Sequence, residues 1–296
     1  MESKDFPILH QVSSASAVNA QKRHFLVLRT KIATLLVIAA IASVNWGGEP
    51  DVRMLAGVVS AIFIVVSMTL SALMDIRKSD QTWFSSRAIA ESVKKESWRF
   101  MMKAEPYDGA ISDSVAEERF LDRMREILDR QSSALAGELG SNLDERAMIT
   151  ECMKQVRKKP FEDRRAFYAK ERIHDQKLWY TAKAKWNRTQ QSRWFLISWI
   201  LQIAAAALAL ALIKFGDVPM VNPVGILTTA GAGVMSWVNA RNYREISQSY
   251  GLVAHELTLL EAREAHATTE EKSLEILEDV EGTISREHTI WLARRM

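Results

Sequence analysis

Histidine and cysteine are the side chains that most often carry catalysis or bind metals, and the sequence holds six histidines and one cysteine, Cys152. His255-Glu256 begins like a zinc-binding helix, but Leu259 stands where that motif needs its second histidine. No glycine-rich phosphate-binding motif and no G-x-S-x-G nucleophile motif occurs in the sequence. We therefore predict a protein that is not an enzyme and that has no metal or other cofactor.

Basic side chains are the second kind of group that could bind a ligand. Residues 154–193 contain thirteen Lys and Arg against four Asp and Glu, whereas residues 112–151 contain five against ten. The basic segment fits attraction to anionic lipid headgroups together with pairing to the acidic segment, and it also fits a pocket for a phosphate ligand such as a nucleotide messenger. The first candidates for binding an anionic ligand or lipid are Lys154, Arg157, Lys158 and Lys159.

The elements that must position these side chains are helices, because the apolar residues are concentrated in four uncharged blocks. Residues 54–74 and 194–213 are uncharged over the length that a helix needs to cross the hydrocarbon layer. Residues 221–240 form a third block, and residues 32–46 form a shorter one that spans if Arg29 and Lys31 extend to the headgroups. We predict transmembrane spans at about residues 29–46, 54–74, 194–214 and 221–240.

The spans pair into two hairpins through short turns rich in Gly, Pro and Asp, at residues 47–51 and 216–219. Lys and Arg flank the opposite ends of the spans, and by the positive-inside rule both termini are cytoplasmic. The predicted fold is an all-α membrane protein with two transmembrane helical hairpins, whose long cytoplasmic helices form a helical bundle. It is predicted to be multi-pass in the inner (cytoplasmic) membrane, and the competing interpretation is that the apolar blocks are buried helices of a soluble protein.

The two hairpins indicate a duplicated architecture along the 296 residues. We predict an N-terminal unit at 1–106, a helical connector at 107–159 and a C-terminal unit at 160–296. A formal net charge of only +3 gives no general signature of nucleic-acid binding, so the predicted partners are the lipid bilayer and not DNA or RNA.

Small and hydroxylated residues form stripes along the spans. The four apolar blocks contain no Asp, Glu, Lys or Arg, and because coupled transporters normally place an ionisable group there, this argues against a coupled transporter. The stripes either pack helices closely or face a water-filled lumen, and a lumen requires several copies of the chain, so a pore would be a homo-oligomer. The candidate pore-lining or packing residues are Gly57, Ser60, Ser67, Ser71, Gln202, Gly225, Thr229, Ser236 and Asn239.

Two stretches resemble the SLATT family of bacterial two-transmembrane domains. The C-terminal half carries the resemblance through Tyr168, Arg172, Asp175, Gln176, Trp179, Tyr180, Lys183, Asn187, Glu287, His288, Trp291 and Arg294. The N-terminal half resembles another SLATT subtype through Gln21–Phe25, Arg87–Ser92, Trp98 and Ala104–Pro106. The chain is thus similar to a tandem of two SLATT-type domains.

The resemblance implies a membrane effector of a prokaryotic conflict or antiviral defence system that forms pores, encoded near proteins that generate or sense nucleotides. It therefore also implies a nucleotide second messenger or a nucleotide-sensing protein as a partner. Our leading hypothesis is an oligomeric pore or channel gated from its cytoplasmic helices, and the alternative is a membrane-anchored helical scaffold or sensor that conducts nothing. The polar and aromatic motif residues either clamp the terminal helix onto the helix that precedes the third span or sense a ligand.

Overall fold

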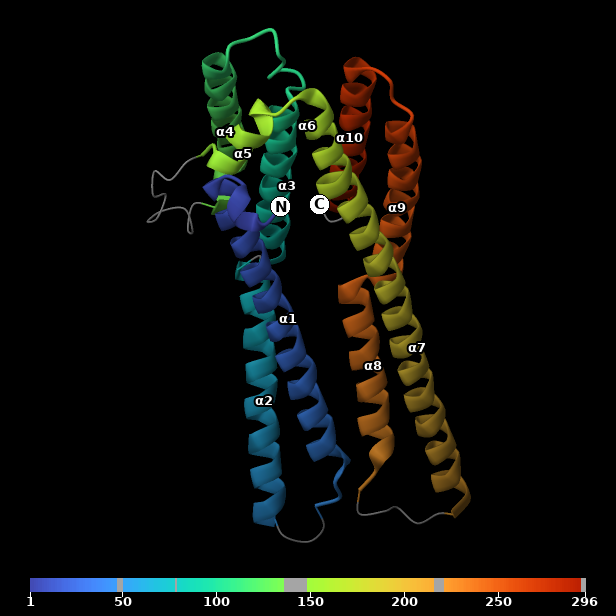
Figure 1. Cartoon of the computed structure of the whole chain (residues 1–296). Coiled ribbons are helices and arrows are strands. Elements are labelled where there is room, and N and C mark those ends of the chain that lie inside the picture. The colour runs from blue at the N-terminus through green and yellow to red at the C-terminus, as the bar shows by residue number, and fades with distance from the viewer. Residues whose placement is uncertain (47–49, 78, 136–147, 216–220, 294–296) are drawn as a thin grey trace. The chain divides into compact units, whose positions relative to one another are not determined.

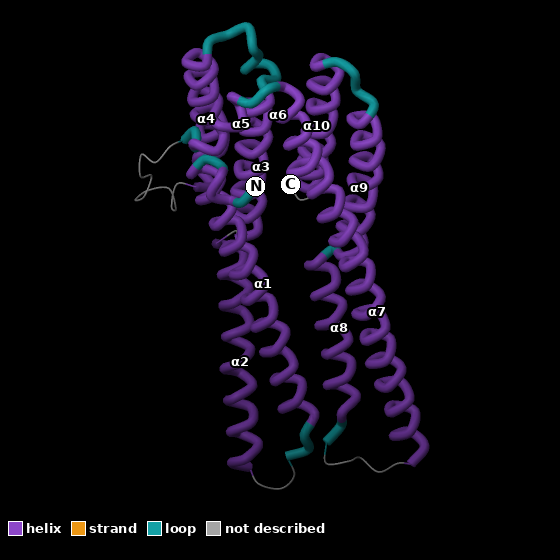
Figure 2. The backbone as a smooth tube through the Cα atoms, viewed as in Figure 1, coloured by secondary structure: helices purple, strands orange, loops and turns teal. Residues whose placement is uncertain are grey.

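The computed structural model describes residues 1–46, 50–77, 79–135, 148–215 and 221–293. Helices make up nearly all of this part of the chain (Figure 1). The described residues form no β-strand, and their extended pairing is limited to one isolated antiparallel bridge between Val44 and Val221 (Figure 2). The all-α prediction is confirmed.

The helices differ widely in length, from single turns to rods long enough to cross a bilayer. In chain order they are a 3₁₀ turn at Ser3–Asp5, α1 (Ile8–Ser43), α2 (Pro50–Arg77), α3 (Ser79–Met102), α4 (Asp113–Leu135), α5 (Glu151–Lys158), α6 (Phe161–Tyr168), a π-helical segment (Ala169–His174), α7 (Asp175–Phe215), α8 (Pro223–Arg241), α9 (Tyr243–Ala265) and α10 (Glu270–Ala293).

Local sequence explains where several helices begin and end. The Thr150 side chain accepts the backbone N–H of Met153 and caps α5. The Asn222 side chain caps α8 in the same way, with Pro223 at the first helical position, where its missing N–H costs nothing. Asn242 adopts the left-handed conformation at φ 49°, which ends α8 and separates it from α9.

The chain divides into two compact units, each assembled from segments that are distant in sequence. Unit 1 comprises Met1–Gln21, Asp80–Ala184 and Gln248–Met296, and unit 2 comprises Lys22–Ser79 and Lys185–Ser247. Each compact unit is therefore built from separate segments of the chain. The predicted division at residues 106 and 159 instead follows the repeated hairpin along the sequence, and it stays a prediction.

Unit 1 has an aromatic core of the kind expected in a water-soluble helical domain. Trp98, Phe100 and Tyr107 are fully buried, and the rings of Phe100 and Phe120 lie 5.2 Å apart. Leu257, Leu277 and Val280 bring α9 and α10 into the same kind of interior. The buried residues Val253, Leu257 and Leu260 of α9, and Leu277 and Val280 of α10, are three or four positions apart, so each of these two helices packs by one face.

Unit 2 consists of two helical hairpins, α1 with α2 and α7 with α8, which are joined near their turns. The backbone N–H of Asn222 donates to the Ser43 carbonyl at 2.7 Å, next to the Val44–Val221 bridge. Glycines bring α8 close to both neighbours: a Cβ on Gly233 would lie 2.8 Å from Ile32 of α1, and one on Gly231 would lie 3.6 Å from Gln202 of α7. Small residues permit this close approach.

Three helical stretches are long and apolar enough to cross a membrane: Ile8–Ser43, Pro50–Met102 and Phe161–Lys214. Only 17%, 0% and 11% of their apolar windows are buried within the chain, so these windows are not the core of a soluble protein. The first three predicted spans are thus supported by length, composition and exposure. The fourth, in α8, is not among these candidates, and its insertion stays a prediction.

Replacing Gly233 by leucine tests the packing of α8 on α1. Because even a Cβ would overlap Ile32, we expect Gly233→Leu to destabilise unit 2 by about 1–3 kcal/mol. The matched control is Gly225→Leu on the same helix, where an added Cβ would have no atom within 4 Å. Thermal unfolding of the full chain in detergent, followed by circular dichroism, measures the difference. Equal stability of the two variants would contradict the packing described.

Candidate functional site

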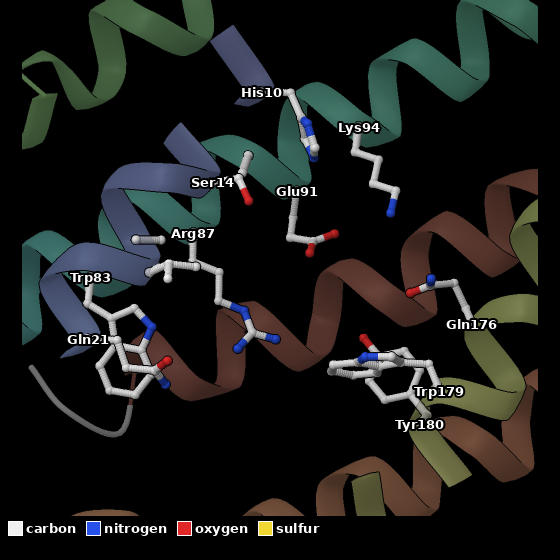
Figure 3. A pocket seen from close by; sticks show the side chains of 13 residues that line it. His10, Ser14, Gln21, Trp83, Arg87, Glu91, Lys94, Gln176, Trp179 and Tyr180 are labelled. Atoms are coloured by element: carbon white, nitrogen blue, oxygen red, sulfur yellow. The ribbon is translucent and has the colours of Figure 1, made fainter. Parts of the chain in front are cut away.

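A cavity of about 350 Å³ lies within unit 1 between α1, α3 and the first turns of α7 (Figure 3). This volume falls in the range of small-molecule binding sites. The residues that line it are His10, Ser14, Ala17, Val18, Gln21, Trp83, Arg87, Ala90, Glu91, Lys94, Gln176, Trp179 and Tyr180.

The cavity is built by one face of each helix. His10, Ser14, Ala17 and Gln21 recur at three and four residues along α1, and the lining residues of α3 recur in the same way from Trp83 to Lys94. Residues at this spacing lie above one another on a helix surface. Gln176 and Trp179 come from α7, directly after the π-helical segment, and such segments are frequent at functional sites.

His10 is a buried histidine whose Nδ1 atom has no hydrogen-bond partner among the described residues. Its side chain is 9% exposed and points into the cavity in Figure 3. Burial, and next the positive charge of Lys94, lower the pKa of His10 to about 4, so the imidazole is neutral at neutral pH. A ligand could therefore exchange a hydrogen bond with this ring without changing its charge.

Charged groups of α3 face the same space. The side chains of Arg87, Glu91 and Lys94 all extend into the cavity in Figure 3. Burial, and next the positive charge of Arg172, lower the pKa of Lys94. Two cations and one carboxylate leave the cavity with a positive balance, which favours a ligand that carries an anionic group.

Aromatic side chains form the α7 side of the cavity. The rings of Trp179 and Tyr180 lie 5.0 Å apart and almost perpendicular, and each packs against Tyr250 of α9 within 5.4 Å. The Trp179 indole lines the cavity and is partly exposed, so it offers a face on which a planar ligand can stack. The site thus combines stacking surfaces, cations and amide groups, a set suited to binding a planar polar molecule.

A buried ion pair holds the segment that leads into the cavity. Arg172 of the π-helical segment donates two hydrogen bonds to the Glu281 carboxylate of α10, at 2.8 and 2.7 Å, and both residues are 1% exposed. The Tyr168 hydroxyl donates to the same carboxylate at 3.1 Å. This arrangement fixes the start of α7 against α10.

The motif residues of the C-terminal half fall into three groups. Gln176, Trp179 and Tyr180 line the cavity, while Tyr168 and Arg172 bind α10 through Glu281. Asp175 and Lys183 are exposed, with the Lys183 ammonium 5.8 Å from the Trp179 ring, and Asn187 is buried in unit 2. The side chains of Glu287, His288, Trp291 and Arg294 lie outside the described residues.

The four candidate basic residues do not converge on one site. Arg157 is 3% exposed and donates to the carbonyls of Phe100 and Tyr107 and to Asp113, so it is part of the interior of unit 1. Lys154 pairs with Glu117 at 3.1 Å. Lys158 and Lys159 are exposed, and the Lys159 ammonium lies 5.0 Å from the Phe167 ring. The candidate anion site at these residues stays a prediction, with Arg157 committed to internal contacts.

The predicted polar stripes of α2 and α8 differ in how exposed their residues are in unit 2. On α2, Ser67 is buried and Ser60 and Ser71 are half-buried, while Gly57 is exposed. Gly225, Ser236 and Asn239 of α8 are exposed and Thr229 is half-buried. The Gln202 amide donates to Ser198 on its own helix at 3.0 Å.

Sequence reasoning did not single out His10, Ser14 or Lys94 as site residues. His10 lies in no motif, and its role depends on α3 and α7, which are far from it in sequence. The one local signal was the repeat of small and polar residues at positions 10, 14, 17 and 21, on a face that apolar residues would otherwise occupy.

The depressed pKa of His10 predicts a loss of stability in mild acid. The folded chain binds this proton only near pH 4, whereas the unfolded chain binds it near pH 6.5. Stability is therefore unaffected above pH 6.5 and falls as the pH drops below it, by roughly 2 kcal/mol at pH 5. Chemical denaturation of the full chain above pH 6.5 and at pH 5 measures this loss of stability, and His10→Gln should abolish the loss. His255→Gln, an exposed control on α9, should retain the loss. If the stability of the two variants depended equally on pH, His10 would not be its cause.

Two family models match the chain in tandem. Residues 7–165 match SMODS and SLOG-associating 2TM effector domain 3, and residues 168–291 match SMODS and SLOG-associating 2TM effector domain 1. No curated protein and no solved structure matches the chain. The first match covers more than half of the 296 residues and includes His10, Arg87 and Lys94, and the second includes Gln176 and Trp179. Each match therefore contributes residues to the cavity.

Proposed function

The chain belongs to the SMODS and SLOG-associating 2TM effector domain (SLATT) family as a tandem of two such domains, and from this premise we propose that it is a pore-forming membrane effector. In this proposal several copies assemble in the inner membrane of a prokaryotic cell, with both termini in the cytoplasm. Opening of the pore compromises the membrane as part of a conflict or antiviral defence response.

The exposed face of α8 is the observation that carries this proposal. The exposed positions 225, 228, 232, 236 and 239 recur at three and four residues, and they are Gly, Thr, Ala, Ser and Asn, with Met235 beside them. The least apolar side of this helix is thus turned away from α1 and α7. A hydrophobic solvent would disfavour such a face, whereas a water-filled lumen or a second copy would accommodate it.

The contrast with α2 strengthens the proposal. The exposed side of α2 carries large apolar residues such as Ile62, Val65 and Met68, while its serines turn inward. Such a surface suits lipid tails. The face of α8 then remains as the surface that contacts neighbouring copies and lines the passage, which accounts for its lower apolar content.

In this proposal the activating ligand binds in the cavity of unit 1. α1 contributes His10 and Ser14 to the cavity and continues into the first span, and α7 contributes Gln176 and Trp179 and continues into the third. A ligand that binds better to one arrangement of these helices would shift the pore between closed and open states. We propose a nucleotide messenger, or a nucleotide-sensing protein that contacts this region, as the trigger.

A membrane-anchored scaffold that recruits partners without conducting is the second candidate function. The observation in its favour is the wide exposed helical surface of unit 1, including Leu252 and Leu259 of α9. Measuring conduction separates the two functions, because a scaffold leaves the bilayer tight.

Dye efflux from liposomes tests the pore directly. The full chain is reconstituted, and release of a self-quenching dye is followed with and without cyclic mono- and dinucleotides. We expect efflux from the wild-type protein, its loss in Ala232→Trp on the exposed face of α8, and its retention in Ile62→Trp, a matched exposed site on α2. If inserted, oligomeric protein never released dye under any of these conditions, the pore would be excluded and the scaffold favoured.

A further inference from the structure

Two arginines meet on a pair of aromatic rings in unit 2, at the ends of the spans opposite the turns. The Arg241 guanidinium of α8 lies 3.7 Å from the centre of the Phe25 ring and 4.8 Å from that of Trp237. The Arg29 guanidinium of α1 lies 5.0 Å from the Trp237 ring. The Phe25 and Trp237 rings are 5.6 Å apart, so the four side chains form one cluster, the arginine–aromatic cluster.

This cluster contains buried hydrogen-bond donors that have no acceptor among the described residues. Trp237 Nε1 and Arg241 Nε are buried and have no hydrogen-bond partner among the described residues. Among the residues that the structure describes, no carboxylate lies within ion-pair distance of Arg29 or Arg241. An unpaired buried donor costs about 1–3 kcal/mol, and more when it is charged. Such a cost points to an acceptor that binds from outside.

The aromatic rings attract the guanidiniums but accept no in-plane hydrogen bond from them. The buried Nε–H of Arg241 therefore has no acceptor among the described residues. Two guanidiniums beside the same indole also repel each other. An anion with several oxygens would relieve both effects, and phosphate matches the planar fork of arginine in a bidentate manner.

The place of the cluster in the chain identifies the source of that phosphate. Arg29 stands at the polar end of the first span, Arg241 is the last residue of α8, and Trp194 lies 6.4 Å from Trp237, as expected of an aromatic belt at headgroup level. Residues 22–31, 75–79, 185–193 and 241–247 of this end carry eleven Lys and Arg against two Asp and Glu. The local field therefore favours anionic over zwitterionic lipids.

We propose that Arg29, Arg241 and the indole N–H of Trp237 form a binding site for the phosphodiester of an anionic phospholipid. The lipid bridges α1 of the first hairpin and α8 of the second, at the ends opposite their hydrogen-bonded turns. It acts as a structural ligand of unit 2, and this role is independent of the cavity in unit 1 and of whether the chain conducts.

Lipid-dependent thermal stability of the full chain in detergent tests the site. Phosphatidylglycerol should raise the melting temperature of the wild-type protein, whereas phosphatidylcholine and inorganic phosphate should not. Arg29→Gln/Arg241→Gln should weaken the apparent affinity for phosphatidylglycerol by about ten-fold or more. Arg188→Gln/Arg193→Gln, which removes two exposed cations at the same end of the spans, is the matched control and should retain the shift.

Trp237→Phe guards against a folding defect, because it keeps an aromatic ring beside Phe25 while it removes the N–H donor and part of the indole. Without lipid this variant should still unfold in a single cooperative transition, and it should respond less to phosphatidylglycerol than the wild type does. An equal response of wild type and the Arg29→Gln/Arg241→Gln variant would overturn the site. An equal shift from inorganic phosphate would overturn its assignment to lipid and leave a free-phosphate site instead.

Discussion

Glu281→Gln is expected to destabilise unit 1 by about 3–5 kcal/mol, because it leaves the Arg172 guanidinium buried without a counter-charge. Burial disfavours the charge of Arg172, but the Glu281 carboxylate outweighs this effect and raises the pKa of the guanidinium. The variant loses this compensation, and because a guanidinium is not deprotonated in proteins, Arg172 bears the full cost of a buried charge. Chemical denaturation of the full chain in detergent, followed by tryptophan fluorescence, measures the change.

The control for this prediction is an exposed ion pair on neighbouring helices. Arg263 and Asp279 also lie 2.8 Å apart, but both are about half exposed, so Asp279→Asn should cost about 0–1 kcal/mol. Replacing both buried partners, in Arg172→Met/Glu281→Leu, should restore most of the lost stability because no unpaired charge remains. Equal effects of Glu281→Gln and Asp279→Asn would show that the buried pair is not what holds α10 on the π-helical segment.

Arg157→Gln is expected to have the next largest effect, a loss of about 3 kcal/mol in the stability of unit 1. The arginine donates to the carbonyls of Phe100 and Tyr107 at 2.8 and 2.9 Å and to Asp113 at 2.9 Å, and it stacks on the Phe100 ring. Hydrogen bonds from a charged donor contribute about 1.5–3 kcal/mol, and glutamine cannot reach all three acceptors. The neighbouring Lys158→Gln, at an exposed position, should change stability by less than about 0.5 kcal/mol.

Thermal denaturation of the full chain with each of these two substitutions shows whether Arg157 has a structural role or is free to bind a ligand. If Arg157→Gln melted like the wild type, the arginine would be free to serve an anionic ligand as the basic sequence segment first indicated. The opposite result would leave Lys158 and Lys159 as the accessible members of that candidate set.

The helical architecture was predictable because it follows from composition along the chain. Uncharged blocks of about 20 residues leave few alternatives to membrane-crossing helices, and the turns at residues 47–51 and 216–219 mark where the chain reverses. What composition does not determine is which face of a span turns inward. Ser67 and Ser236 occupy similar stripes in sequence, yet the first is buried against its own chain and the second is exposed.

The candidate site was predictable only in part, because it depends on partners that are distant in sequence. Motif residues Gln176, Trp179 and Tyr180 do line the cavity, but His10 and Lys94 come from two other helices. A clamp of the terminal helix onto the helix before the third span was one of two roles predicted for the motif residues. It stays a prediction, because the side chains of Glu287 and His288 lie outside the described residues; Arg172 binds Glu281 of α10. Burial decides such roles, and burial is a property of the folded unit.

The same limitation applies to the glycines of α8. Gly225 belongs to the predicted packing stripe, but a Cβ at this position would have no atom within 4 Å, whereas a Cβ on Gly233, outside that stripe, would lie 2.8 Å from Ile32 of α1. The role of the predicted stripe stays a prediction, because helical periodicity alone cannot state whether its neighbour is the same chain, lipid or another copy.

Thiol accessibility of α8 in the membrane tests the central claim, that its small and polar face meets water. In a Cys152→Ser background, Ser236→Cys and Ile62→Cys place one thiol on the exposed face of α8 and one on the apolar face of α2. With the protein reconstituted in liposomes, a membrane-impermeant thiol reagent should modify Ser236→Cys rapidly and leave Ile62→Cys unmodified. If both thiols were equally protected, the face of α8 would contact lipid or protein instead of water, and the proposed passage would not exist.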